Sequence, residues 1–199
     1  MNRTKRLTSI NLASAENVIQ AAGYADQIGL PLNRHLTITW ELAQCIGRVQ
    51  DFQVKFFERY AKWIRYHGGI PAYVWAIENG SVWGHHSHIL VHIPSHLYWD
   101  FKKMAPRWID GEPDQSGHTK TFWPEQIRYG FGVNRWNSLK GVVRYILKGV
   151  ESEWACLFGI EPRPDKAGIV FGKRVGTSQN IGRAARNKNL TKPDIRDAA

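Results

Sequence analysis

The chain is poor in cysteine and has no long hydrophobic run. Its two cysteines, Cys45 and Cys156, match neither a CxxC pair nor a zinc-ligand spacing, so we expect two reduced, packed residues rather than a disulfide framework. No stretch approaches the ~18 uninterrupted apolar residues that a membrane span needs, and the first residues lack the apolar block of a secretory signal. We therefore expect a cytoplasmic protein with no membrane partner.

Acidic residues are also scarce: 17 Asp and Glu stand against 27 Lys and Arg, which gives a net charge of +10. Such a surplus favours a polyanionic partner, and nucleic acid is favoured over an anionic membrane surface. Hydrophobic residues make up 43 %, with nine Trp, which excludes a wholly disordered chain. The length of 199 residues fits one compact domain with extensions, or two very small domains.

Alternation of apolar and β-branched residues predicts strands over His35–Trp40, Ala72–Glu78 and His86–Ile93, and a short one near 127–133. The Asn79-Gly80 turn signal joins the second and third strands as a hairpin. Helical spacing of apolar residues predicts helices over about 52–66 and from about 134 to 150. The expected fold class is therefore α+β, with a central antiparallel β-sheet and helices packed on it.

Three segments are expected: an N-terminal extension over 1–33, a central domain over 34–158, and a basic C-terminal segment over 159–199. From Arg163 onward, nine basic residues stand against three acidic ones. Two interpretations remain open: this segment contacts nucleic acid, or it is a solvated terminus or one packed on the domain. Under the first, the expected contacts are Lys173, Arg174, Arg183 and Arg186.

Histidines gather in the third predicted strand. Because strand side chains alternate, His86, His88 and His92 share one face, whereas His85 lies on the other. Two imidazoles two residues apart can bind one divalent ion, and Glu78 on the hairpin partner can add a carboxylate. An isolated His-x-His is also common as an ordinary polar pair on a strand, so this motif alone leaves both interpretations open.

Tyr145 and Lys148 lie three residues apart in the last predicted helix, on the face opposite its apolar stripe. A phenol is a poor nucleophile at neutral pH, so attack by Tyr145 requires nearby positive charge, which Lys148 can supply. An ordinary amphipathic helix with a polar Tyr and Lys is the alternative.

Taken in order, Leu36-Thr-Ile-Thr-Trp40, the His86-Ser-His88-Ile-Leu-Val strand and Tyr145-Ile-Leu-Lys148 resemble the three motifs of the HUH endonucleases. Within that superfamily the chain is similar to the rolling-circle replication initiator (Rep) proteins of plasmids and phages, over about residues 35–150. The resemblance implies a ferredoxin-like sheet that carries a metal on one face, beneath a helix that presents the tyrosine. Ser87 departs from the pattern, because a bulky apolar residue usually stands between the two histidines.

The resemblance implies that His86, His88 and Glu78 bind Mg²⁺ or Mn²⁺, that Tyr145 cuts one DNA strand through a 5′-phosphotyrosine link, and that Lys148 stabilises the phosphate or the tyrosinate. Thr39 and Arg144 are further expected DNA contacts. Exposed tryptophans can stack on unpaired bases, the candidates being Trp83, Trp99, Trp123 and Trp136.

The partners implied are single-stranded DNA at a replication origin, in a hairpin where the origin forms one, and a bacterial host's helicase and polymerase, because the chain has no P-loop motif. A transposase or mobilisation relaxase with the same site is one alternative. A nucleic-acid-binding module without catalysis, in which the histidines are structural, is the other.

Overall fold

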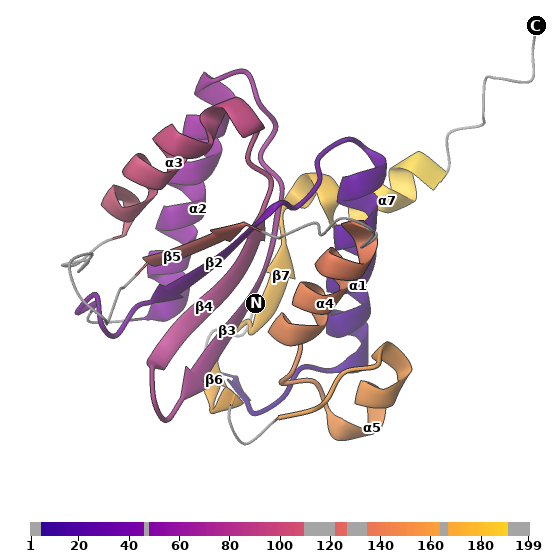
Figure 1. Cartoon of the computed structure of the whole chain (residues 1–199). Helices are drawn as coiled ribbons and strands as arrows, with labels where there is room; N and C mark the ends of the chain where they lie inside the picture. The colour runs from indigo at the N-terminus through magenta and orange to yellow at the C-terminus, as the bar shows by residue number, and fades with distance from the viewer. Residues whose placement is uncertain (1–4, 46–47, 110–121, 127–134, 164–166, 191–199) are drawn as a thin grey trace, which may run out of the picture.

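The computed structural model describes residues 5–45, 48–109, 122–126, 135–163 and 167–190 (Figure 1). The elements, in chain order, are β1 (Arg6–Leu7), α1 (Leu12–Gln27), β2 (Arg34–Thr39), α2 (Val49–Tyr66), β3 (Tyr73–Gly80), β4 (Gly84–Val91), η1 (Ser95–Leu97), α3 (Tyr98–Met104), η2 (Ala105–Trp108), β5 (Phe122–Gln126), α4 (Arg135–Ile146), α5 (Ser152–Ala155), η3 (Cys156–Phe158), β6 (Val170–Phe171), β7 (Val175–Thr177), η4 (Gln179–Ile181) and α7 (Arg183–Leu190). Of the helices in these ranges, none combines the length and the apolar character that crossing a membrane requires.

The central sheet has five strands in the order β5-β2-β4-β3-β7, and every neighbouring pair is antiparallel. A second, two-stranded sheet pairs β1 with β6. The α+β class with a central antiparallel sheet is therefore confirmed. The strand expected over 127–133 lies outside the described residues, whereas β5 occupies Phe122–Gln126.

Helices cover both faces of the central sheet, α2 and α3 on one side and α1 and α4 on the other (Figure 1). Because strand side chains alternate, Trp75, Ile77 and Ile89 pack in the core beneath α2, whereas Val74 and Leu90 pack in the core beneath α1. Helix α2 buries the stripe that its spacing predicts, namely Phe56, Phe57, Tyr60 and Ile64.

Both chain ends contribute to this domain. Helix α1, from the expected N-terminal extension, begins at the cap residue Asn11, whose side chain accepts a hydrogen bond from the Ser14 amide, and it buries five apolar side chains in the core. From the expected C-terminal segment, β7 pairs with β3 at one edge of the sheet. Residues on both sides of the expected boundaries at 33/34 and 158/159 thus pack together.

Ser87 lies on the α2 side of the sheet, in a short buried chain of polar groups. The indole N–H of Trp40 donates to the Ser87 hydroxyl at 2.7 Å, and that hydroxyl donates to the Gln53 side-chain oxygen at 2.5 Å. A bulky apolar residue at position 87 would leave the Trp40 donor and the Gln53 acceptor unpaired, which explains why the chain tolerates a small polar residue here.

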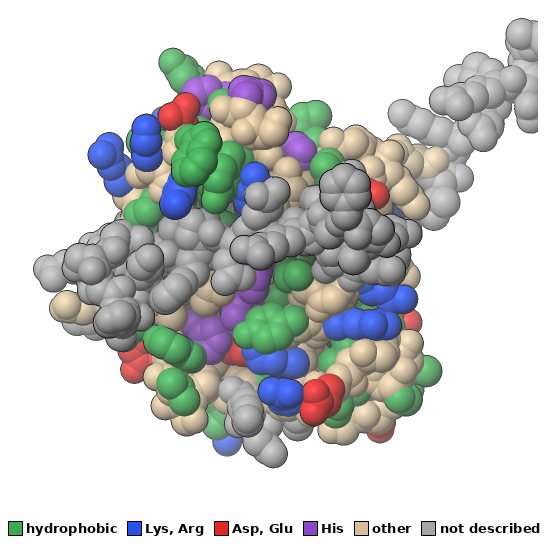
Figure 2. Space-filling view, in the orientation of Figure 1, with side chains coloured by type: hydrophobic (Ala, Val, Ile, Leu, Met, Phe, Trp, Pro, Cys, Tyr) green, Lys and Arg blue, Asp and Glu red, His purple; other side chains and the backbone are tan. Residues whose placement is uncertain are grey.

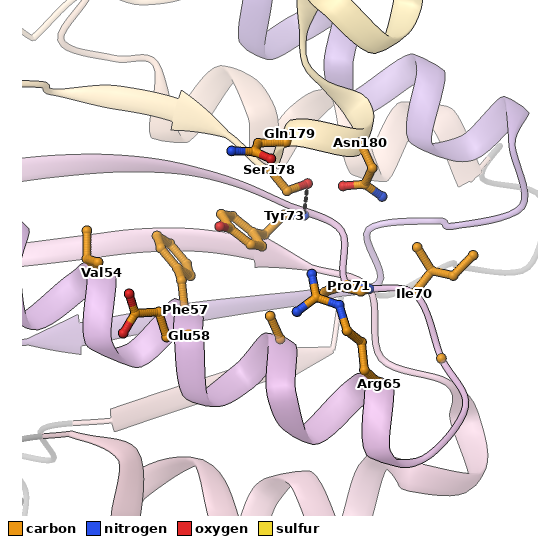
Figure 3. A pocket seen from close by; sticks show the side chains of 12 residues that line it. Val54, Phe57, Glu58, Arg65, Ile70, Pro71, Tyr73, Ser178, Gln179 and Asn180 are labelled. Atoms are coloured by element: carbon orange, nitrogen blue, oxygen red, sulfur yellow. Dashed lines mark hydrogen bonds between the residues drawn. The ribbon is translucent and has the colours of Figure 1, made fainter.

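A pocket of about 600 Å³ opens on the α2 side, where α2 meets the start of β3 and the chain after β7 (Figure 3). Stacked rings of Phe57 and Tyr73, with centroids 4.0 Å apart, form its wall, and Arg65 and Glu58 are among its polar lining. Within the described part of the chain, no residue expected from the sequence in a catalytic, metal or DNA site lines this pocket.

Arg174 connects β1, near the N-terminus, with the C-terminal segment. Its guanidinium donates to the carbonyl oxygens of Leu7 at 3.2 Å, Gly168 at 2.9 Å and Ala167 at 2.6 Å, and the residue is 2 % exposed. This arginine joins β1 to the turn before β6.

We predict that Arg174→Met lowers the free energy of unfolding by about 3 kcal/mol, because it leaves buried carbonyl groups without their donor. The exposed Arg183→Met is the matched control and should change stability by no more than about 0.5 kcal/mol. Urea denaturation of both variants checks this, and equal midpoints would contradict the role given to Arg174.

Candidate metal centre

The pairing register of the β3–β4 hairpin brings the candidate ligand residues together. Glu78 on β3 is directly opposite His86 on β4, and His88 is opposite Ala76, two pairs further along. Because residues two apart share a face, Glu78, His86 and His88 all project toward α4. The same sheet face is apolar further along, at Val74 and Leu90, where α1 covers it.

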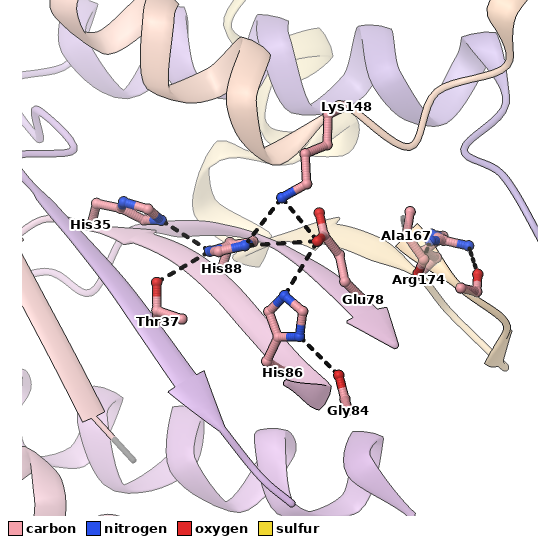
Figure 4. A network of polar contacts seen from close by, with 10 residues as sticks. His35, Thr37, Glu78, Gly84, His86, His88, Lys148, Ala167 and Arg174 are labelled. Carbon is pink, nitrogen blue, oxygen red and sulfur yellow. Dashed lines mark hydrogen bonds and ion pairs between the residues drawn. The ribbon is translucent and has the colours of Figure 1, made fainter. Parts of the chain in front are cut away.

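The His86 and His88 side chains both point toward one oxygen of the Glu78 carboxylate (Figure 4). Glu78 Oε2 lies 3.2 Å from His86 Nε2 and 3.8 Å from His88 Nε2. One ligand atom from each residue lies within 4.8 Å of the others, and all three residues are buried. Two imidazoles and a carboxylate in this arrangement can bind a divalent metal ion.

A hydrogen bond at the hairpin turn orients His86. His86 Nδ1 lies 2.9 Å from the Gly84 carbonyl oxygen, and since a carbonyl only accepts, Nδ1 carries the proton and Nε2 points at Glu78. Gly84 has a φ of +57°, and a Cβ there would overlap the Glu41 carboxylate, so the turn requires glycine.

Two residues of β2 hold His88 from the other side. His88 Nδ1 lies 3.2 Å from His35 Nε2 and 3.2 Å from the Thr37 hydroxyl, which leaves His88 Nε2 facing Glu78 (Figure 4). Thr37 is directly opposite His88 in the β2–β4 register, and His35 lies two residues before Thr37 on the same face. Such outer partners fix the orientation of a histidine ligand.

Electrostatics keep the site in a metal-binding protonation state. Burial by itself raises the pKa of the Glu78 carboxyl, but the contact with His86 and the charge of Lys148 outweigh burial, so the pKa lies below the ordinary value. Burial, and next the charge of Lys148, hold the pKa of His88 well below its ordinary value and lower that of His35 to about 4. At neutral pH the carboxylate is therefore ionised and these imidazoles are neutral.

The second oxygen of the Glu78 carboxylate differs from the first in its contacts. Glu78 is 3 % exposed, and its second oxygen, Oε1, is buried without a hydrogen-bond partner among the described residues. A buried carboxylate oxygen with no donor is costly, and coordination of a cation is one way to satisfy it. The donor set and this oxygen both fit a divalent ion.

Tyr145 and Lys148 lie directly beside this cluster. The Tyr145 ring centroid is 5.0 Å from that of His88, and the tyrosine is 48 % exposed. Lys148 Nζ lies 2.9 Å from Glu78 Oε2 and 4.0 Å from the centre of the Tyr145 ring. Lys148 follows the end of α4 at Ile146, in a turn closed by its own amide, which donates to the Tyr145 carbonyl at 3.2 Å.

Tyr145 is an exposed residue beside this buried cluster. Figure 2 shows histidine side chains on the surface of the molecule, next to a hydrophobic side chain and Lys or Arg side chains. Since Tyr145 is half exposed, an external molecule can reach the phenol while the ligand residues stay buried.

Of the expected DNA contacts, Thr39 lies at this site, on the sheet face of the candidate ligands. Lys173 and Arg183 are exposed, Thr39 is buried opposite His86, and Arg144 donates to the Phe158 carbonyl at 2.8 Å. Trp83 and Trp99 are exposed, at 44 % and 66 %, whereas the side chains of Trp123 and Trp136 lie outside the described residues.

Arg174 and Arg186 are bonded within the fold, in line with the second interpretation of the basic segment, in which it packs on the domain. Arg174 donates to three carbonyl groups, as described above, and Arg186 donates to the Ile181 carbonyl and to the side chains of Asn17 and Gln20 on α1. Arg186 is 9 % exposed. Charge counted along the chain does not distinguish buried from exposed arginines.

The sequence motifs do not indicate His35, and they place His92 on the face of His86 and His88. In the structure His92 Nδ1 donates to the Pro31 carbonyl at 2.8 Å, beyond the end of β4, whereas His35 contacts His88. The available signal was the alternation of β2, which places His35 on the face of Thr37 and Thr39.

Comparison of the chain with protein-family models, with curated proteins and with solved structures finds no match.

We predict that the chain binds a divalent ion through this cluster, with Mn²⁺ as the probe. Glu78→Gln and His86→Asn should each weaken Mn²⁺ binding by about tenfold or more, because each removes a donor atom. His85→Asn is the matched control, since His85 is the neighbouring histidine beside Glu41 and should retain wild-type affinity. Isothermal titration calorimetry measures the affinities, and equal losses at 85 and 86 would contradict the site.

The low pKa of His35 predicts a loss of stability in acid. The pKa of His35 is about 4 in the folded protein, against an ordinary 6.5 in the unfolded chain. Below pH 6.5 the unfolded chain therefore binds a proton at His35 that the folded chain does not bind, and the free energy of unfolding decreases. Between pH 7 and pH 4.5, in EDTA, His35→Gln should lose about 2 to 3 kcal/mol less of its free energy of unfolding than the wild type. Exposed His67→Gln serves as the control; identical pH profiles of His35→Gln and wild type would refute the assignment.

Proposed function

We propose that the protein is a metal-dependent endonuclease and strand transferase of single-stranded DNA, in which Tyr145 is the nucleophile. The convergence of Glu78, His86 and His88 directly beside Tyr145 supports this function most strongly. The three ligands come from the β3–β4 hairpin, and Tyr145 comes from α4, which is distant from the hairpin in the sequence. The resemblance of the chain to the HUH endonucleases suggests the same function, and within it nicking at the origin of a rolling-circle replicon.

The chemistry needs a polarised phosphate and a nucleophile in line with it. A divalent ion held by Glu78, His86 and His88, which we propose to be Mg²⁺ or Mn²⁺, would lend positive charge to the scissile phosphate. The paired strands β3 and β4 fix the ligand residues, and burial keeps His88 neutral by lowering its pKa. Tyr145, at the end of α4, is accessible to a DNA strand that crosses this face.

Tyr145 forms the new bond. Its phenol oxygen attacks phosphorus, the bond from phosphorus to the 3′-oxygen breaks, and the phenol proton ends on that oxygen. The products are a 5′-phosphotyrosine link and a free 3′-hydroxyl that can prime synthesis. Because the link conserves the bond energy, attack by a 3′-hydroxyl restores the DNA strand and the free tyrosine.

Lys148 and the basic surface suit an anionic substrate. The Lys148 ammonium lies over the Tyr145 ring, where positive charge stabilises a phenolate or a phosphotyrosine. Exposed Lys173 and Arg183 and the exposed Trp99 ring offer contacts to phosphates and bases. We propose single-stranded DNA, including an origin hairpin, as the substrate, with a host helicase and polymerase as later partners.

We predict that Tyr145→Phe abolishes the covalent DNA adduct but leaves binding of single-stranded DNA within about twofold of wild type, because only the nucleophilic oxygen is removed. Wild type and variant are incubated with a pool of plain and hairpin oligonucleotides and Mn²⁺ or Mg²⁺, with and without EDTA. Denaturing gels and mass spectrometry of tryptic peptides then locate the adduct. Tyr66→Phe, on an 84 % exposed tyrosine of α2, is the matched control and should retain the adduct.

An adduct that persists in Tyr145→Phe would overturn the choice of nucleophile. DNA binding by wild type without a covalent species, across both metals and a broad sequence pool, would favour a binding module instead. Adduct formation only at sequences outside replication origins would favour a transposase or a mobilisation relaxase.

A further inference from the structure

Lys148 contacts two of the three candidate metal ligands in this structure. Its Nζ atom lies 2.9 Å from Glu78 Oε2 and 3.5 Å from His88 Nε2 (Figure 4). Only 14 % of its side chain is exposed, so the ammonium is held inside the site rather than in solvent. These are the atoms that face the centre of the ligand cluster.

A lysine ammonium and a divalent ion cannot both occupy this place. Glu78 Oε2 accepts the ammonium at hydrogen-bond distance, and metal donors approach an ion to roughly 2.0 to 2.2 Å. The two positive charges would then repel each other across a single oxygen in a buried site. The His88 nitrogen that the ammonium faces is also a nitrogen that the ion needs as a donor.

The structure also indicates where the ammonium can go. The Lys148 backbone is held on both sides, since its amide donates to the Tyr145 carbonyl at 3.2 Å and its carbonyl accepts from the Arg163 amide at 2.7 Å. The four-carbon side chain can therefore turn while the backbone stays in place. The Tyr145 ring is already 4.0 Å away and half exposed, so a displaced ammonium remains beside the phenol.

We propose that Lys148 is a built-in cation that neutralises Glu78 in the ion-free protein and is displaced toward Tyr145 when a divalent ion binds. This inference rests on the metal centre of the proposed function but not on DNA cleavage. The Lys148 charge, which is paired with Glu78 before the ion binds, is then released to act on a phosphate at Tyr145, which makes ion loading the first step. Lys148 is thus a positioning residue that links ion binding at Glu78 and His88 to the positive charge beside Tyr145.

The test uses the full chain and Mn²⁺ alone. Lys148→Met keeps the length of the side chain but removes the competing charge, so Mn²⁺ should bind about tenfold more tightly than to wild type. Lys140→Met, an exposed lysine on α4, is the matched control and should bind as wild type does. Calorimetry gives the affinities, and circular dichroism verifies that each variant is folded.

A second readout uses the wild-type protein, so it does not depend on the folding of a variant. Acetylation with an amine-reactive reagent, followed by mass spectrometry, should modify Lys148 faster when Mn²⁺ is present, whereas the rate at Lys140 should not change. Equal or weaker Mn²⁺ binding by folded Lys148→Met, or a Lys148 acetylation rate that Mn²⁺ does not raise, would overturn the displacement. If neither wild type nor Lys148→Met binds Mn²⁺, the metal centre and the proposed function fail together.

Discussion

The charge of Glu78, buried in the sheet, is the constraint on which the site depends. An ionised carboxylate that is 3 % exposed is costly unless positive groups and hydrogen-bond donors surround it. His86 supplies one contact from the neighbouring strand, and Lys148 supplies a cation from the turn after α4. Neutralising Glu78 therefore brings the end of α4, with Tyr145, onto the sheet. The fold and the candidate chemistry therefore both depend on neutralising the Glu78 charge.

The sheet satisfies that requirement because the face toward α1 and α4 changes character along its length. Where α1 covers it, Val74 and Leu90 form part of an apolar core. The same alternation presents His88 two pairs further along the hairpin, and Glu78 and His86 four pairs further along. The apolar part anchors the helices, and the polar part lies at their edge, where a partly exposed tyrosine borders buried ligands. Ligand side chains on paired strands are held more rigidly than they would be on loops.

The basic character of the chain is divided between structure and surface. Arg174 and Arg186 are bonded to carbonyl and amide groups inside the fold, and they join the N-terminal segment, at Leu7 and on α1, to the C-terminal segment. Lys173 and Arg183 stay exposed. A net charge of +10 therefore overstates the charge that an anionic partner meets, because a guanidinium with its five donors is well suited to bind several backbone carbonyls.

The sequence by itself determined the class of the fold, the hairpin that carries Glu78, His86 and His88, and the apolar stripe of α4, because each follows from local periodicity and turn chemistry. Only the tertiary structure decided that β7 completes the sheet, that α1 belongs to the core, and that Arg174 is buried. It also decided that His35 supports His88 and that Lys148 contacts Glu78. Those contacts join residues more than fifty positions apart, and no local pattern encodes which strands become neighbours or which cation reaches a buried carboxylate.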